Sequence, residues 1–559
     1  MNIKKFEYYF SERVLLKILC RKRILLAKKE HDKLFHKKIL LKKGHDNLDE
    51  LYQIFPSRNK WLRLNKNERR GKSALEINVI QLERTVLRAT EKFKKKPIEK
   101  WHQNLIEMLL ALRSNILNHK YEVPKPLVLK QFKEIKSKKT IYRPIAYFEY
   151  LDRIIIGQVN KYLTDCFDPL FLDCSYAFRS IKKGGKPFTH HLAVEDIINF
   201  KKEHHNEDLY VAECDIKKFY DCVNHNKAKE IFKINIKKCN SQGIEIDNRA
   251  KNLFYSYLEC YSFNEDVLAA RLPKNSEFGW VKTSDLLKVG SDSTNESIGV
   301  PQGGAISCLI ANLLMHEVDE KVMKFIDKKN TFYARFCDDM VLLSNSKGDC
   351  KSILEVYSNT LKDMKLLSHP FSEFKVYSKE FWKSKSKAPY KWAKNDFAKN
   401  VKNNVPWLSF VGYQVNSDLK IRVRRSSLKK EINKQFRETG KVISLINGGF
   451  DFRISERAIK YRVTQRLLSM SVGRRNVFYR DQSIQMCWTS GFKLLRESDN
   501  IVFQPKHLDR KRAKNLARLD SKLRKMDKAN RPDRNRKKAD IDKEPKYYGH
   551  PFSYFSQLK

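Results

Sequence analysis

The sequence predicts an α+β protein in which short strands lie among many helices, and two hydrophobic patterns support this prediction. Residues 209–216 and 331–343 are short apolar runs rich in residues that favour strands, and a polar turn interrupts the second run. Apolar residues at helical spacing mark an amphipathic helix before the first run, and they are Trp101, Leu105, Leu109, Leu112 and Ile116.

The charge of the chain is strongly unbalanced. Its 559 residues include 113 Lys and Arg against 65 Asp and Glu, which gives a net charge of +48. Hydrophobic residues make up 41% of the chain, which argues against wholesale disorder. A chain this basic repels itself unless a polyanion neutralises it, so we expect a nucleic-acid partner bound through its phosphates. A basic structural protein of the ribosomal type is the alternative.

The cysteines and the hydropathy bear on the compartment. The 11 cysteines include no Cys-x-x-Cys pair, so we expect reduced thiols and no zinc module. No stretch of about 18 apolar residues predicts a membrane span, and the N-terminus lacks a signal-peptide core. We therefore expect a cytoplasmic protein with no membrane partner.

Composition divides the chain into four predicted parts. Residues 1–120 are basic and helical, and residues 121–425 mix helices with strands around an insertion at 226–297. Residues 426–500 return to a helical pattern. Residues 501–559 carry 18 Lys and Arg against 7 Asp and Glu, and we expect this tail to be partly disordered until RNA binds.

Three carboxylates are the candidate metal ligands. Asp215 ends the first apolar run, beside backbone carbonyls such as that of Ile216, and Asp338 and Asp339 lie at the turn of the second run. Adjacent like charges are costly unless water or a metal stabilises them. Each feature alone also fits a solvated strand end or a polar turn. Together, carboxylates that converge from separate strands suit two Mg²⁺ ions about 3.5–4 Å apart, as phosphoryl transfer requires.

A loop between the two runs has the sequence Gly-Val-Pro-Gln-Gly at residues 299–303. Pro301 stiffens this loop, and Gly303 and Gly304 permit a close approach of the backbone to another group. Gln302 offers both a hydrogen-bond donor and an acceptor. We therefore expect the loop to contact a ligand or another segment of the chain.

Six motifs in a fixed order make residues 125–425 similar to the reverse transcriptase family. The resemblance is nearest to bacterial enzymes of the group II intron type. The motifs are Tyr-Arg-Pro-Ile at 142–145, Ser-Tyr-Ala-Phe-Arg at 175–179, Cys-Asp-Ile at 214–216, Gly-Val-Pro-Gln-Gly at 299–303, Phe-Cys-Asp-Asp at 336–339 and Phe-Val-Gly-Tyr at 410–413.

The resemblance implies a right-hand polymerase with fingers, palm and thumb, which copies RNA into DNA. It implies that Asp215 and Asp338 bridge two Mg²⁺ ions, which Mn²⁺ can replace, while Asp339 supports them. With the carbonyl of Ile216 these residues form the predicted metal site. The implied partners are an RNA template, deoxynucleoside triphosphates and the DNA product, and an oligomer is compatible with the sequence.

The resemblance also implies which residues hold the nucleotide. Arg143 would steady the triphosphate, together with Lys136 or Lys139, because a guanidinium fork matches phosphate oxygens. A solvated basic loop is the alternative for these lysines. Tyr220 stands where the family has its steric gate against a 2′-hydroxyl, with core packing as the alternative. Gln302 and Gly303 would contact the incoming nucleotide or the template.

The remaining segments suggest the biological role. The sequence has no HNH-type Cys/His block, no Val-Thr-Gly signature of retron enzymes, and no RNase H or integrase block. Its helical N-terminal and basic C-terminal extensions resemble those of defence-associated and abortive-infection reverse transcriptases, so we expect an antiphage enzyme that uses a structured non-coding RNA. The alternatives are an intron maturase and template-independent or protein-primed synthesis, for which Tyr547, Tyr548 and Tyr554 are conceivable primers.

Overall fold

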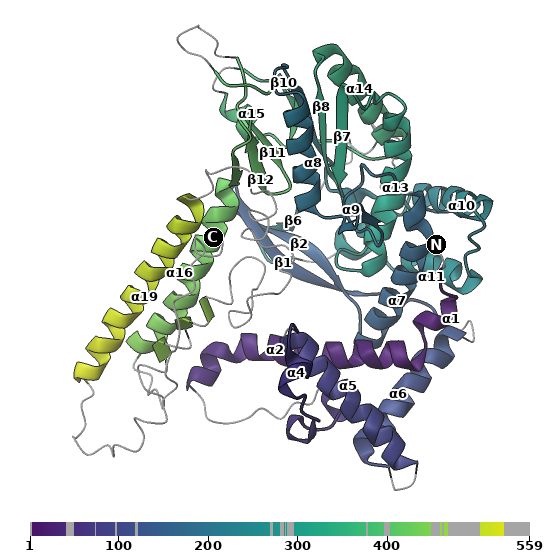
Figure 1. The fold of residues 1–559 in the computed structure, drawn as a ribbon, viewed down its shortest axis with the longest axis vertical. Helices are drawn as coiled ribbons and strands as arrows, with labels where there is room; N and C mark the ends of the chain where they lie inside the picture. The colour runs from purple at the N-terminus through teal and green to yellow at the C-terminus, as the bar shows by residue number, and fades with distance from the viewer. Residues whose placement is uncertain are drawn as a thin grey trace. The chain divides into compact units, whose positions relative to one another are not determined.

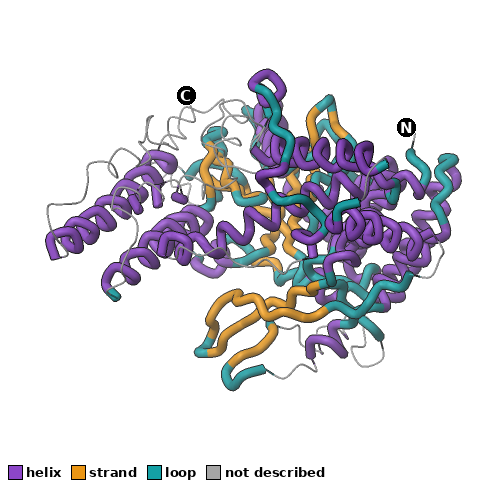
Figure 2. Tube along the Cα trace, turned by 90° about the horizontal axis from the view of Figure 1, so that it is seen from below, coloured by secondary structure: helices purple, strands orange, loops and turns teal. Residues whose placement is uncertain are grey.

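The computed structural model contains both helices and sheets, which confirms the α+β class (Figures 1 and 2). Figure 2 shows the strands, in orange, gathered in separate groups among purple helices. The structure describes residues 3–40, 50–72, 74–94, 98–117, 121–268, 272–279, 296–375, 378–395, 403–448 and 503–529, and parts of 284–287 and 459–467.

The chain forms two compact units. The first contains residues 1–14, 109–411 and 415–419, and the second contains residues 15–108, 412–414 and 420–559. All of the predicted carboxylates and nucleotide-binding residues belong to the first unit.

A five-stranded sheet is the centre of the first unit. Its order is β7-β8-β5-β10-β9, and only β9 and β10 run parallel. Strands β5, β7 and β8 are almost wholly buried, which explains why they appear in the sequence as apolar runs. The strands are β5 (Tyr210–Asp215), β7 (Thr331–Phe336), β8 (Asp339–Ser344), β9 (Phe371–Ser372) and β10 (Ser386–Lys391).

Helices cover this sheet and extend its core. Helix α14 packs on β5, β8 and β10, α8 packs on β7, and α13 contacts both α7 and α14. Helix α13 is buried on nearly all sides, in keeping with its continuous apolar sequence. The bounds are α1 (Phe6–Tyr9), α7 (Tyr150–Phe167), α8 (His190–Glu203), α9 (Phe219–Cys222), α13 (Ala305–Met323), α14 (Lys347–Asp363) and α15 (Lys379–Lys383).

The insertion predicted at residues 226–297 forms part of this core. It contains most of α10 (His225–Ser241), α11 (Asn248–Glu259) and the short strand β6 (Ser276–Phe278). The rings of Phe232 and Phe254 stack at 3.6 Å and join the two helices. Strand β6 pairs in parallel with β2 (Lys139–Tyr147), which itself forms an antiparallel hairpin with β1 (Leu127–Lys136).

The second unit is mostly helical. Its described elements include most of α2 (Glu12–Leu40) and half of α6 (Lys100–Leu117), together with α3 (Glu50–Gln53), α4 (Lys66–Arg69), α5 (Ala74–Phe93), α16 (Arg425–Asn447) and α19 (Phe503–Ala529). The strands β11 (Trp407–Phe410), β12 (Tyr413–Asn416) and β13 (Ile421–Val423) form a three-stranded sheet.

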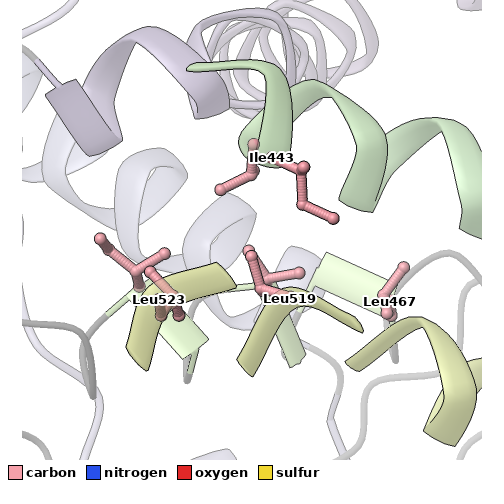
Figure 3. Packing of buried hydrophobic residues seen from close by; sticks show 7 residues of the cluster. Ile443, Leu467, Leu519 and Leu523 are labelled. Carbon is pink, nitrogen blue, oxygen red and sulfur yellow. The ribbon is translucent and has the colours of Figure 1, made fainter. Parts of the chain in front are cut away.

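The structure describes residues 503–529 of the basic tail, and the expectation of a partly disordered tail stays a prediction. Residues 503–529 form helix α19, whose Leu519 and Leu523 pack with Ile443 of α16 and Leu467 in a buried cluster (Figure 3). The proposed primers Tyr547, Tyr548 and Tyr554 lie outside the described residues.

Two observations concern the helices and cysteines in the described part of the chain. None of its helices is long and apolar enough to cross a bilayer. The ten cysteines in the described ranges are all free thiols, and most of them are buried.

A buried ion pair fixes the β7–β8 hairpin. Arg335 of β7 is fully buried, and its guanidinium donates to both carboxylate oxygens of Asp319 in α13, the shorter bond being 2.7 Å. The same guanidinium donates to the Ser175 hydroxyl at 2.8 Å and to the Cys337 carbonyl at 3.1 Å. Arg335 therefore connects the second sequence motif, α13 and the hairpin turn.

We expect Arg335→Met to lower the free energy of unfolding by about 3–5 kcal/mol, because Asp319 would remain buried without its cation. Urea unfolding measures this loss. The control is Lys321→Ala in α13, the helix that also contains Asp319. This change breaks an exposed ion pair with Asp363 and should cost under about 1 kcal/mol. A loss of equal size in the two variants would contradict the role given to Arg335.

Candidate active site

Strand pairing brings the predicted carboxylates together. In the antiparallel β5–β8 ladder, Asp215 lies directly opposite Asp339. Asp338 precedes β8 and occupies the two-residue loop after β7, with Cys337. The structure thus places all three carboxylates at one end of two adjacent strands, as the sequence predicted.

The turn holds Asp338 close to Asp215. Cys337 has a φ of 61°, a left-handed conformation that is strained for a residue with a side chain. Burial, and secondarily the negative charge of Asp215, raise the pKa of Asp338 above its usual value. A carboxyl whose ionised form is disfavoured by burial and by a neighbouring carboxylate suits a bound cation.

Lys385 is a residue of this site that the sequence did not reveal. Its ammonium lies 2.7 Å from the Asp215 carboxylate and 3.3 Å from Nε2 of His369. The backbone N–H of His369 donates to the Asp215 carbonyl at 3.0 Å, and Ser386 Oγ accepts from the Asp215 N–H at 3.1 Å. Asp215 is therefore fixed through both its main chain and its side chain.

The donor set fits a hard divalent cation. Among the described residues, no three His, Cys, Asp or Glu side chains gather tightly enough to hold a metal alone. Asp215 and Asp338 supply two carboxylates, and the main-chain carbonyl of Ile216 is the third ligand that the sequence predicted. Mg²⁺ accepts oxygen ligands of this kind, and it usually keeps water and substrate phosphates as its other ligands. Two carboxylates and a carbonyl are consequently sufficient.

A second cluster surrounds Asp221, one turn after β5. This carboxyl is almost fully buried, and burial raises its pKa to about 6. It accepts a hydrogen bond from the side-chain amide of Gln302, and the Lys218 ammonium lies 3.8 Å away. The charges of Lys218 and Arg143 favour its ionised form. The structure therefore gathers Gln302, Lys218 and Asp221 in one corner, near enough to Arg143 for its charge to act on Asp221.

The loop at residues 299–303 is held from two sides. Ala146 of β2 donates to the Gln302 carbonyl at 2.9 Å. Gly303 has a φ of 104°, which favours glycine, and it lies against the backbone of Ala146. On the other side a side chain at Gly304 would overlap the hydroxyl of Tyr257, which belongs to the insertion. Both glycines thus allow the close approach expected from the sequence.

Tyr220 lies beside the hairpin turn. Its hydroxyl is 3.3 Å from the sulfur of Cys337 and 3.9 Å from that of Cys308. Burial raises the pKa of this phenol well above its usual value, so it stays protonated. The ring is only partly buried, which is compatible with both a steric gate and core packing.

The predicted lysines are placed differently from Arg143. Lys139 begins β2 and forms an ion pair with Glu277 of β6 at 3.1 Å. Lys136 ends β1 directly opposite Lys139. Four strand residues separate Lys139 from Arg143, roughly 13 Å along the chain. The structure does not bring these lysines into the corner that contains Gln302 and Asp221.

The supporting residues gave weak signals in the sequence. Asp221 follows the Cys-Asp-Ile motif, but nothing local identifies Gln302 as its partner 81 residues away. Asp319 interrupts an apolar helix, and that interruption could have indicated a buried partner. Lys385 lies in a basic stretch, where its 170-residue separation from Asp215 hides the contact.

Comparison with known proteins identifies a domain within this chain. Residues 135–370 match the family model described as reverse transcriptase (RNA-dependent DNA polymerase). The chain is 37% identical over 94 residues to the retron Ec73 reverse transcriptase of Escherichia coli, which covers 16% of this chain and 26% of that protein. It is 25% identical over 201 residues to the group II intron-encoded protein LtrA of Lactococcus lactis subsp. cremoris, covering 36% and 26%.

These matches confirm the resemblance to bacterial reverse transcriptases. They also include a retron enzyme, although the sequence lacks the Val-Thr-Gly signature of that type. The chain spans about a quarter of the length of these curated relatives. The structure is also similar to apo telomerase from Candida tropicalis truncated from its C-terminal domain, with a TM-score of 0.35 and 14% identity over 67% of this chain and 75% of that one.

We expect the stability difference between the wild type and Asp221→Asn to depend on pH. The folded-state pKa of about 6 lies above the unfolded value of 3.8. The contribution of the protonated Asp221 carboxyl to the free energy of unfolding is therefore fully present below about pH 4. It is lost as the pH rises to about 6, because the buried group must then ionise. The uncharged variant should gain on the order of 2–3 kcal/mol relative to the wild type across that window.

Urea midpoints measured on both sides of this window test the prediction. The control is Asp363→Asn, which removes the exposed carboxylate of the ion pair with Lys321 and should cost under about 1 kcal/mol. A constant difference between the wild type and Asp221→Asn would show that burial does not perturb this carboxyl.

Proposed function

We propose, from the reverse transcriptase domain that residues 135–370 form, that this chain is an RNA-directed DNA polymerase. The observation that carries the proposal is the β5–β8 register, which sets Asp215 opposite Asp339 and beside Asp338. Carboxylates from two separate strands are the ligands that nucleotidyl transfer requires. The wider assignment to fingers and palm at 121–425 and a thumb at 426–500, within a right-hand fold, is part of this proposal.

The carboxylates would hold two Mg²⁺ ions, for which Mn²⁺ can substitute. When bound, the ions supply activation of the primer 3′-hydroxyl and neutralise charge on the triphosphate. Asp215 and Asp338 would be the shared ligands, Ile216 would contribute its carbonyl, and Asp339 would support the pair. Lys385 keeps the Asp215 carboxylate oriented and offsets part of the negative charge between the carboxylates.

The corner around Asp221 would bind the nucleotide. Arg143 is exposed on β2, and its guanidinium can pair with phosphate oxygens. Lys218 adds a second, partly buried cation. Asp221 fixes the amide of Gln302, and Gly303 lets that loop approach β2. Lys139 remains a proposed phosphate contact, and it would have to leave Glu277 to make one.

The template would be RNA, and the net charge of +48 supports a large polyanionic partner. We propose a structured non-coding RNA as this template and a role in antiphage defence in the cytoplasm, with an oligomer as a possible assembly. The similarity to a retron reverse transcriptase is compatible with such a role. An intron maturase and template-independent or protein-primed synthesis are the alternatives.

We expect Asp338→Ala to abolish nucleotide incorporation and to leave RNA affinity within about twofold, because phosphate contacts lie elsewhere. Primer extension and filter binding measure the two properties. The control, Asp349→Ala, removes an exposed carboxylate from α14 and should preserve both. Incorporation by Asp338→Ala would show that the carboxylates are wrongly assigned.

Sequencing the DNA that copurifies with the wild type extends this test. DNA complementary to a cellular RNA, absent from Asp338→Ala, is the expected result. Homopolymeric DNA would instead favour template-independent synthesis, and DNA that resists phenol extraction would favour a protein primer.

We expect Tyr220→Ala to admit ribonucleotides, because the missing ring no longer crowds a 2′-hydroxyl. The ratio of kcat/KM for deoxynucleotides to that for ribonucleotides should fall roughly tenfold or more. Tyr220→Phe keeps the ring and loses only the contacts with two thiols, so its ratio should match the wild type. If the ratio is the same in all three proteins, Tyr220 is a packing residue.

A further inference from the structure

A basic groove lies between α16 and α19, outside the reverse transcriptase domain. The two helices run side by side in the second unit (Figure 1). The groove has a volume of about 530 Å³, and its lining includes Asn433, Phe436, Lys511, Lys514, Asn515 and Arg518.

The packing of the two helices explains where the groove opens. Val442 and Ile443 of α16 meet Leu519 and Leu523 of α19 in the buried cluster shown in Figure 3. These apolar residues hold the helices together about two turns beyond Phe436. At the preceding turns polar side chains take their place, and several of them, such as Gln435 and Asn515, are buried. The groove opens beside these buried side chains, where Phe436, Lys514 and Arg518 are exposed.

The charge in the groove has one sign. Lys511, Lys514 and Arg518 lie on one face of α19, at the spacing that helical neighbours share. None of the described residues that line the groove is acidic. Asp520 of the same helix is instead paired with Lys460 at 2.7 Å and with Arg524 at 3.0 Å. The groove thus presents three cations to an anionic ligand.

An aromatic ring lies among these cations. Phe436 is 52% exposed, which is unusual for a side chain of this size. The guanidinium of Arg518 lies over the ring, 4.7 Å from its centroid, and holds it in place. A fixed and exposed ring surrounded by cations is the arrangement on which an unpaired base stacks while its phosphates are neutralised.

The amides favour RNA over DNA. Asn433 and Asn515 line the same groove, and each side-chain amide offers a donor and an acceptor. A ribose 2′-hydroxyl can use both, and deoxyribose lacks this group. A paired base has no exposed face for Phe436, so a duplex does not match the groove.

We propose that the α16–α19 groove binds an unpaired segment of RNA, with one base stacked on Phe436 and its phosphates on Lys511, Lys514 and Arg518. This site is additional to the polymerase centre and does not require the carboxylates. It would anchor a single-stranded part of the RNA to the C-terminal part of the chain.

Binding of an unstructured RNA oligonucleotide to the full-length protein, measured by fluorescence anisotropy in a chelator, tests the groove without catalysis. Phe436→Leu should weaken binding roughly tenfold, because the stacking surface is lost. Phe436→Trp keeps an aromatic face and should bind within about twofold of the wild type. Thermal unfolding should be unchanged in both variants, since the ring is half exposed.

Salt dependence tests the cations separately. Lys514→Ala should reduce the slope of log affinity against log salt by about 0.7, the contribution of one phosphate contact on a single strand. The matched control is Lys525→Ala, which removes an exposed lysine of α19 outside the groove and should leave the slope nearly unchanged. Thiouridine crosslinks of the RNA should map to α16 and α19 in the wild type and be lost in Phe436→Leu.

Several outcomes would overturn the proposal. The first is an RNA affinity of Phe436→Leu equal to that of the wild type. The second is that Phe436→Leu loses as much affinity for single-stranded DNA or for a blunt RNA duplex as it loses for single-stranded RNA. The third is that Lys514→Ala and Lys525→Ala have the same salt slope. Because the assay contains no metal or nucleotide, failure of the groove would leave the polymerase assignment untouched. Conversely, an inactive wild-type polymerase could still bind RNA here.

Discussion

The antiparallel register between β5 and β8 is the constraint on which the candidate site depends. It sets Asp215 opposite Asp339, and it brings the turn residue Asp338 near enough to Asp215 for their charges to interact. Side chains alternate between the two faces of a sheet, so a slip of one residue would turn one of these carboxylates to the other face. The site is therefore specified by the pairing of whole strands and not by the motifs alone.

Buried polar contacts maintain this register and the loops around it. Arg335 joins the hairpin to α13 and to Ser175, so the second motif acts here as a structural support. Tyr257 performs a similar function for the glycine loop, because its hydroxyl contacts Ser307 at 2.7 Å and leaves room only for a glycine at 304. The insertion that contains Tyr257 is thus a structural part of the site. Satisfied polar networks of this kind favour one arrangement over its competitors.

The sequence predicted what local patterns encode and missed what distant partners decide. Apolar runs ending in Asp residues predicted β5, β7 and β8 together with the three carboxylates. The contact between Lys385 and Asp215, and that between β6 and β2, left no local trace because each joins segments more than a hundred residues apart. Helix α19 was not predicted because the many charges of the tail obscured a sparse helical repeat of leucines, among them Leu516, Leu519 and Leu523.

The large positive charge of the chain serves two physically different purposes. Lys385 and Lys218 each lie beside one carboxylate, so their charges are largely neutralised and their contribution is orientation over a few ångströms. The lysines of the α16–α19 groove face no acid among the described lining residues, and their charges can neutralise phosphates. Affinity for a polyanion grows with the number of phosphates neutralised, and catalysis depends on the placement of a few oxygens. A chain can therefore separate the two tasks, with paired cations at the carboxylates and unpaired cations on a helical surface.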